Sequence, residues 1–454
     1  MENTTANQKL NNISRQILYF LVVSPVLFLL VNKWPYLLVL SVLASLLIGI
    51  LFFFTKRSIT TFHVEIIGIL LIIYIYFILS YFFSGQNLKN FLSYAFLKND
   101  GNFFFCYIPF FIFAIPFFDY KKLANIFFKF IFTVFTVFSF LGILEYFLTS
   151  KSILTRTDQY VGKIYFALNF AHNATGSVYA VVCLFLLVFF LKEKISRFKL
   201  FYLLLLFINL AALFITKSRG SYIGFAAGAI FVIWFNYRSI KKFAAALGVM
   251  VLISLPMILA TGIYKRILQL FDFKGGTGII RLAIWDRAWY LFSQSPLFGI
   301  GFGRFNDIYS LDRSIFDIDR LKGFNGVIAY YANQSFNFDT AHAHNSYLQF
   351  LTETGVLGLG LLILFWVLCL VKLIQAYYKT KDEFASKTFL SAAGSIFVVF
   401  ILALSENYFS VTTLMIPVSI LVSLSIGLAW QDYYACEENC ELRLLNKNIL
   451  TKHI

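Results

Sequence analysis

Long apolar segments recur along the chain, and their length limits what it can fold into. Because the hydrocarbon core of a bilayer is about 30 Å thick, a helix of about 20 mostly apolar residues can cross it. Hydrophobic residues make up 60% of the chain and charged residues only 13%, unlike an average soluble domain. The candidate spans lie at 17–31, 35–54, 62–83, 103–118, 125–148, 171–191, 199–215, 221–236, 242–262, 347–374, 388–405 and 411–430. We therefore predict an all-α polytopic membrane protein with about twelve transmembrane helices.

The loops between these spans carry Lys and Arg in alternation. Cytoplasmic loops of membrane proteins are enriched in these residues, whereas loops longer than about 60 residues escape the rule. The basic loops contain Lys56 and Arg57, Lys121 and Lys122, the cations of 192–199, those of 238–242 and those of 379–387. This alternation places both termini in the cytoplasm and the long loop 264–346 outside. It also explains part of the formal charge of +16, which is therefore no evidence for nucleic-acid binding.

The long loop contains two recognisable local patterns. In "IIRLAIWDRAWYLFSQ", residues 279–294, the apolar positions recur at helical spacing, which predicts an amphipathic helix. Arg281 and Trp285 are four residues apart on one face, so the indole could hold the guanidinium in place. The following "SPLFGIGFGRF" supplies a proline and three alternating glycines, which predict a re-entrant or surface turn. It does not have the spacing of a dinucleotide-binding fingerprint.

The stretch "AHAHNSYLQFLTETGVLG", residues 341–358, places histidines at the mouth of the next span. We expect Asn345 or Ser346 to cap that helix. On a regular helix His344, Gly355 and Gly358 would lie within roughly 40° of one face. The glycines have a structural explanation, since small residues let membrane helices pack closely. His344 could accept a proton from a hydroxyl, or it could be an interfacial histidine that only makes a hydrogen bond.

Other polar residues lie on the same predicted side of the membrane. Lys217 and Arg219 separate two apolar segments in "LFITKSRGSYIGF", where an arginine could bind a ligand or reach lipid phosphate. His172 lies in "NFAHNATGSVYA". Glu406 lies in the turn between the last two spans, where an acidic residue more often makes a packing hydrogen bond than acts as a base. The arginines and histidines on this side suit a pyrophosphate group and a hydroxyl nucleophile: Arg219, Arg281, Arg304, His172 and His344.

These motifs resemble those of the O-antigen ligase and O-antigen polymerase superfamily. "HNSYLQFLTETGVLG" matches the family pattern H-[NSQ]-x9-G-x-x-[GTY], and the resemblance extends to "TKSRGSYIGF", "RLAIWDRAWYLFSQSPLFGIGFGRF" and "NFAHNATGSVYA" over about residues 165–430. It implies a C-type glycosyltransferase of the bacterial inner membrane, with its active site facing the periplasm. Such enzymes move a glycan from undecaprenyl pyrophosphate to an acceptor, and they use neither a metal nor a cofactor.

The resemblance also implies roles for individual residues. By motif, the residues on which ligase activity depends fall on Arg219, Arg281 and His344. His344 would activate the acceptor hydroxyl, and the two arginines would hold the pyrophosphate. Only the register of the motif favours His344 over His342. The further residues expected to contact substrate are Arg304, Lys217, His172, Asn345 and Trp285.

The expected organisation has three parts. Residues 1–160 form N-terminal transmembrane helices, 161–430 form the ligase-like catalytic region, and 431–454 form a cytoplasmic tail without an assignable function. The five cysteines predict no disulfide framework, and the spacing of Cys436 and Cys440 is only a weak metal signal. No metal and no cofactor is predicted.

Several acceptors stay open. A ligase would transfer O-antigen to lipid A-core, a polymerase would join lipid-linked repeat units, and a third branch of the family glycosylates proteins. The paired R-x10-G segments of some polymerases are absent, which favours the ligase modestly. A transporter of lipid-linked sugars remains an alternative of another class, but it would need charge near the middle of the bilayer and paired repeats.

Overall fold

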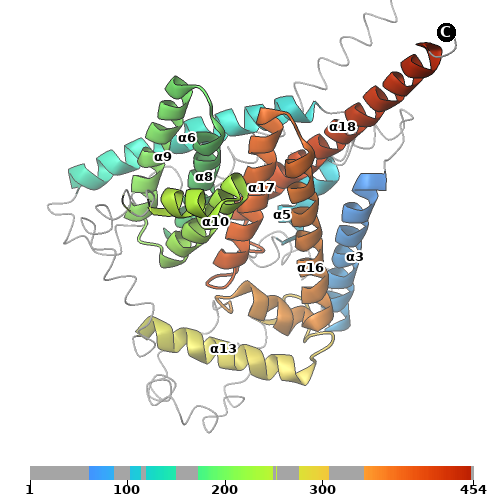
Figure 1. The fold of residues 1–454 in the computed structure, drawn as a ribbon. Coiled ribbons are helices and arrows are strands. Elements are labelled where there is room, and N and C mark those ends of the chain that lie inside the picture. The colour runs from blue at the N-terminus through green and yellow to red at the C-terminus, as the bar shows by residue number, and fades with distance from the viewer. Residues whose placement is uncertain are drawn as a thin grey trace, which may run out of the picture.

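The computed structural model describes residues 61–85, 103–113, 119–149, 172–248, 252, 276–305 and 342–450. Within these ranges the chain forms helices and no strand, and ten of the helices have both ends described (Figure 1). The helices are α3 (Thr61–Phe83), α5 (Phe103–Ile112), α6 (Tyr120–Thr149), α8 (His172–Lys192), α9 (Ser196–Ile215), α10 (Arg219–Tyr237), α13 (Gly276–Gln294), α16 (Ser346–Lys379), α17 (Glu383–Leu402) and α18 (Thr412–Leu450).

Eight of the described helices are long and apolar enough to cross a membrane. They contain the segments Val64–Phe83, Tyr120–Leu144, Asn173–Lys192, Ser196–Ile215, Arg219–Tyr237, Ser346–Lys379, Glu383–Leu402 and Thr412–Asp432. Each of these matches a predicted span, which fits a multi-pass membrane protein. The predicted span 103–118 is described only as the short helix α5. Those at 17–31 and 35–54, and most of that at 242–262, lie outside the described residues.

The centre of the bundle is formed by α8, α17 and α18. The most apolar windows of these helices are mostly or fully buried inside the protein, whereas only 28% to 33% of those of α3, α9 and α16 is buried, as expected for helices that face lipid. At the end of the bundle predicted to be cytoplasmic, ion pairs join neighbouring helices. Lys387 Nζ lies 2.8 Å from Glu193 Oε2, and Lys121 pairs with Asp382. The opposite end carries the polar residues discussed below.

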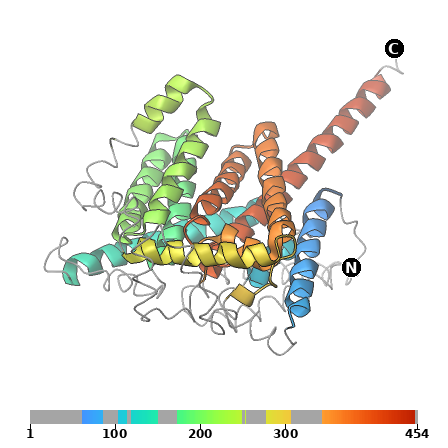
Figure 2. The ribbon, with the colours of Figure 1, turned by 90° about the horizontal axis from the view of Figure 1, so that it is seen from below.

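The helix predicted within the long loop is confirmed as α13. It lies across one end of the bundle, beside the start of α16 (Figures 1 and 2). Its residues Ile284, Ala288 and Leu291 are buried in a small apolar cluster with Phe305 and Ala343. The helical periodicity of the sequence therefore marks the buried face correctly.

α16 is not a regular helix, because its backbone breaks at Gly355. This residue has φ 66° and ψ −173°. The break frees backbone groups on both sides, and the turn that follows α13 fills it. The backbone N–H groups of Ile300 and Gly301 donate to the carbonyls of Thr352 and Glu353, each over 3.0 Å. The N–H of Val356 on the other side of the break donates to the Pro296 carbonyl over 2.9 Å.

The glycines of the two segments make this contact possible. Gly299 and Gly355 both have positive φ, and a Cβ added to either would overlap backbone atoms of the other segment. The prediction that His344, Gly355 and Gly358 share one helical face is wrong for two reasons. The helix begins only at Ser346, after His344, and its rotation is interrupted at Gly355. Gly355 serves the docking of the turn, whereas a Cβ added to Gly358 would meet Thr354 of the same helix and Tyr76 of α3, as expected for close helix packing.

Candidate functional site

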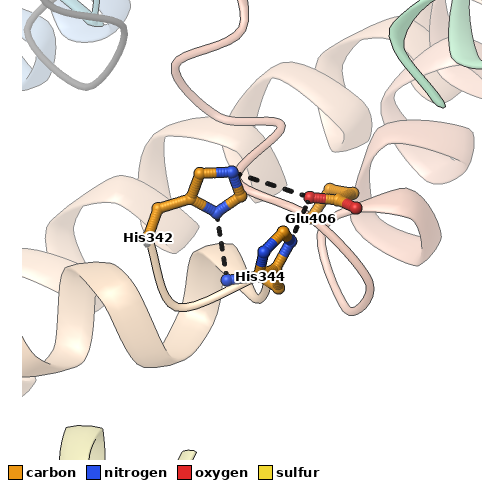
Figure 3. A group of neighbouring side chains, drawn as sticks. All are labelled: His342, His344 and Glu406. Atoms are coloured by element: carbon orange, nitrogen blue, oxygen red, sulfur yellow. Dashed lines mark hydrogen bonds and ion pairs between the residues drawn. The ribbon is translucent and has the colours of Figure 1, made fainter. Parts of the chain in front are cut away.

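Glu406 is the centre of a polar cluster at the end of the bundle near α13. Its carboxylate is mostly buried, with 12% of the side chain exposed. One oxygen, Oε2, lies 2.7 Å from His344 Nδ1 and 3.7 Å from His342 Nε2 (Figure 3). The other oxygen, Oε1, lies 3.2 Å from Arg281 Nη2 and accepts a hydrogen bond from Asn173 Nδ2 over 2.9 Å. Four side chains from three parts of the chain thus converge on one carboxylate.

Backbone contacts fix the turn that carries Glu406. This turn joins α17 to α18, and it packs against the first residue of α16. The N–H of Ser346 donates to the Ala403 carbonyl over 2.8 Å, and its hydroxyl donates to the Glu406 carbonyl over 2.9 Å. On the other side, the Tyr408 hydroxyl donates to the Asn173 carbonyl over 2.8 Å. The carboxylate is therefore held between the starts of α8 and α16.

The residues around His344 are fixed by their own contacts. Asn345 caps α16, as predicted, because its side chain accepts a hydrogen bond from the N–H of Leu348 over 3.1 Å. The Trp285 indole donates to the Ala343 carbonyl over 2.9 Å. Asn345 and Trp285, both expected to contact substrate, thus support the backbone on either side of His344. Arg281, whose guanidinium the Trp285 indole could hold in place, pairs with Glu406.

The environment of Glu406 determines which nitrogen of His344 carries the proton. Burial alone would raise the pKa of this carboxyl, but the hydrogen bond from His344 and the neighbouring His344, His342 and Arg281 charges outweigh it. The pKa lies below its ordinary value of 4.5, so the group is a carboxylate at neutral pH and can only accept. His344 Nδ1 must then donate. In the neutral ring its Nε2 is left as the proton acceptor.

The start of α10 lies next to the same turn. Ser218, which precedes Arg219, donates from its hydroxyl to Asn173 Oδ1 over 3.2 Å. A Cβ added to Gly220 would lie close to the hydroxyl of Ser405, the neighbour of Glu406. The structure therefore brings Arg219, at the first position of α10, to the end of the bundle that holds His344 and Arg281.

Other predicted site residues lie elsewhere or are not described. Arg304 donates to the Ser84 carbonyl at the C-terminal end of α3. This contact ties the turn after α13 to α3, so the expectation that Arg304 contacts substrate has no support from its position. Lys217 lies in the turn between α9 and α10 with φ 54°. His172 is the first residue of α8, and its side chain lies outside the described residues.

Sequence reasoning missed the importance of three residues. Glu406 was expected to be a packing residue more often than a base, Asn173 was noted only as a polar neighbour of His172, and only the register of the motif favoured His344 over His342. One signal pointed to Glu406: it is an acidic residue in a turn predicted to share a side of the membrane with Arg219, Arg281 and His344. A buried carboxylate requires such partners, since an unpaired charge is costly to bury.

Comparison with known proteins identifies the domain that carries most of this cluster. A family model described as O-antigen ligase matches residues 204–363. The matched region includes Arg219, Arg281 and His344, whereas Asn173 and Glu406 lie outside it. No protein of the curated set matches the chain. The family comprises glycosyltransferase-like enzymes. Residues 204–363 thus match an O-antigen ligase domain, which supports the O-antigen ligase and polymerase superfamily.

Proposed function

We propose that this protein transfers a glycan from undecaprenyl pyrophosphate to lipid A-core at the periplasmic face of the bacterial inner membrane. The observation that carries the proposal is the 2.7 Å contact between His344 Nδ1 and Glu406 Oε2. It orients the imidazole as a carboxylate does in other acid–base sites, with Nε2 left to accept a proton. The O-antigen ligase domain supports a lipid-linked glycan as the substrate class.

In the proposed reaction, His344 Nε2 accepts the proton of an acceptor hydroxyl. The hydroxyl oxygen forms a bond to the anomeric carbon of the donor glycan, and the bond from that carbon to the pyrophosphate oxygen breaks. Undecaprenyl pyrophosphate leaves with the bonding electrons, and the anomeric configuration is inverted. Glu406 stabilises the imidazolium that forms.

Arg219 and Arg281 would bind the pyrophosphate and offset its charge as the bond breaks. Arg281 Nη2 already contacts Glu406, but a guanidinium has five N–H donors. Its side chain is 30% exposed, so part of it is open to a ligand. The shared contact with Glu406 also places the phosphate-binding group beside the proposed base.

The position of these residues favours an enzyme over a transporter. His344 precedes α16, Glu406 follows α17, and Arg219 is the first residue of α10. All lie at helix ends rather than in the middle of the spans. A transporter of charged lipid-linked sugars needs binding groups near the bilayer midplane.

Product analysis tests the proposal. The purified protein in nanodiscs is given an undecaprenyl-pyrophosphate-linked glycan with lipid A-core, with a second carrier-linked repeat, or with a protein acceptor. We expect transfer to lipid A-core and a loss of about 10²- to 10⁴-fold in His344→Ala, since general-base catalysis contributes that much. An unchanged melting temperature would show that the variant is folded. A ladder of longer carrier-linked chains would instead identify a polymerase. A glycosylated protein would identify a member of the protein-glycosylating branch. Movement of the lipid-linked sugar across the bilayer without glycan transfer would refute the proposal that the protein is an enzyme.

We further propose that the reaction needs no metal, although His342, His344 and Glu406 place three possible ligand atoms within 4.8 Å of one another. His342 Nδ1 accepts the N–H of His344 over 3.1 Å, so in the neutral ring Nε2 carries the proton and has no lone pair for a cation. The guanidinium of Arg281 on the same carboxylate would also repel a cation.

Treatment with a chelator tests metal independence. We expect that incubation with EDTA, followed by its removal, changes the transfer rate by less than about two-fold, because no step of general acid–base catalysis requires a cation. Elemental analysis of the purified protein is the accompanying control. Activity that is lost with EDTA and restored by Zn²⁺ alone would contradict this prediction.

A further inference from the structure

The backbone of His344 adopts a conformation that needs support. Its φ of 47° places it in the left-handed region, which is unfavourable for a residue other than glycine. The backbone N–H of His344 donates to His342 Nδ1 over 3.1 Å. A side-chain acceptor two residues before an N–H is the arrangement of an Asx turn, which stabilises such a backbone bend. His342 Nδ1 thus accepts the N–H of His344 as the side-chain oxygen of an asparagine accepts an N–H in an Asx turn.

The ring of His342 also lies against the ring of His344. The two ring centroids are 4.1 Å apart and the planes are inclined by 50°. Figure 3 shows both imidazoles beside the Glu406 carboxylate. His342 Nε2 is 3.7 Å from Glu406 Oε2, which is too long for a hydrogen bond. The shorter contact of His342 is therefore the one to the His344 backbone.

We infer that His342 is a positioning residue for His344: its Nδ1 holds the backbone bend that directs Nδ1 of His344 to Glu406 and leaves Nε2 for the acceptor hydroxyl. This inference rests on the proposed function, in which His344 is the base. It assigns different tasks to the two histidines of "AHAHN". A base that is held in place before the substrate arrives raises kcat, whereas substrate binding depends on other groups.

Substitutions of His342 separate its two nitrogens. Asparagine offers an acceptor where Nδ1 lies, so His342→Asn keeps the bond to the His344 N–H. Glutamine reaches further and replaces only the outer nitrogen. His342→Phe keeps a ring without an acceptor, and His342→Ala removes both. If the Nδ1 contact is what matters, only asparagine can substitute.

The test is a measurement of kcat and KM for the four variants, beside wild type and His344→Ala, with melting temperatures to confirm folding. We expect His342→Ala, →Gln and →Phe to lower kcat by about 10- to 10²-fold with KM changed less than about two-fold, since a small misplacement of a catalytic group has effects of this size. His342→Asn should recover kcat to within about five-fold of wild type.

Three results would overturn the inference. His342→Ala could keep the wild-type kcat, His342→Gln could restore activity where asparagine does not, or all four variants could be as inactive as His344→Ala. The last result would make His342 a base itself. Failure of the proposed function has a different signature: wild type would then show no transfer to lipid A-core, or His344→Ala would retain activity. Loss of activity in His344→Ala together with a fully active His342→Ala would overturn only the inference made here.

Discussion

Glu406→Gln is expected to lower kcat of glycan transfer by about 10²- to 10⁴-fold with little change in folding. An amide in place of an orienting carboxylate beside a catalytic histidine has an effect near the upper value in serine proteases. The reason is that the group facing His344 Nδ1 determines which tautomer the imidazole adopts. The carboxylate only accepts and so keeps the proton on His344 Nδ1, whereas an amide NH₂ facing that nitrogen would move the proton to Nε2 and block the base. The amide would also stabilise the imidazolium less well.

Two further variants make this result specific. Glu406→Asp keeps the charge but shortens the side chain, and we expect an intermediate loss. Asn173→Ala removes one donor from Oε1 and leaves the Oε2 contact with His344, so its effect on kcat should be about ten-fold or less. Rates are measured in nanodiscs at saturating donor, with thermal unfolding in parallel. If Glu406→Gln keeps kcat within about five-fold of wild type while folded, Glu406 does not orient the base.

The lowered pKa of Glu406 gives the same variant a pH signature. A carboxyl whose folded-state pKa lies below its ordinary value of 4.5 stabilises the protein above that value, and the contribution is lost as pH falls through the lower folded pKa. The melting temperature of wild type should therefore exceed that of Glu406→Gln at pH values above 4.5. The difference should shrink in more acidic buffers.

The parts of the fold that follow from local sequence were predictable. A membrane span needs only enough apolar residues in a row, and each of the eight described spans coincides with such a segment. α13 was predictable because Ile284, Ala288 and Leu291 recur at helical spacing and are buried together. Asn345 was predictable as a cap because an Asn before an apolar segment accepts an N–H of the first turn.

The break in α16 could not be predicted from the residues around it. The apolar pattern continues through Gly355, and glycines in membrane helices usually indicate close helix packing. What fills the break is the turn 296–301, more than fifty positions earlier in the sequence. The glycines of both segments were visible in the sequence, but their complementarity becomes apparent only in three dimensions.

The candidate site shows the same limit. Glu406 is 62 residues from His344, 125 from Arg281 and 233 from Asn173 in the sequence. The predicted topology reduced the number of candidate site residues to those on one side of the membrane, but it did not show which of them form the site. The candidates included Arg304, which the structure pairs with the end of α3. Residues on the same side of the membrane need not contact each other, and only the fold shows which of them contact Glu406.

Gly355→Ala is expected to disturb the structure strongly. A φ of 66° with a ψ of −173° is a region that only glycine adopts readily, so alanine costs about 1–3 kcal/mol in conformation alone. Its Cβ would also overlap the Leu297 carbonyl, which is backbone and cannot rotate away. The turn after α13 would be displaced, and with it Arg281. We expect a lower melting temperature and a transfer rate at least about 10-fold below wild type.

Gly360→Ala is the matched control, because Gly360 lies in the same helix and a Cβ there meets nothing within 4 Å. Alanine should stabilise this helix by about 0.5–1 kcal/mol or leave it unchanged. Gly299→Ala should disrupt the same contact between the turn after α13 and α16, since its Cβ would overlap the backbone of Glu353. Once one substitution has separated the segments, the other has less left to disturb, so the double variant should lose less than the sum of the single losses. Full additivity, or a Gly355→Ala variant as stable as Gly360→Ala, would show that the docked turn does not hold α13 against α16.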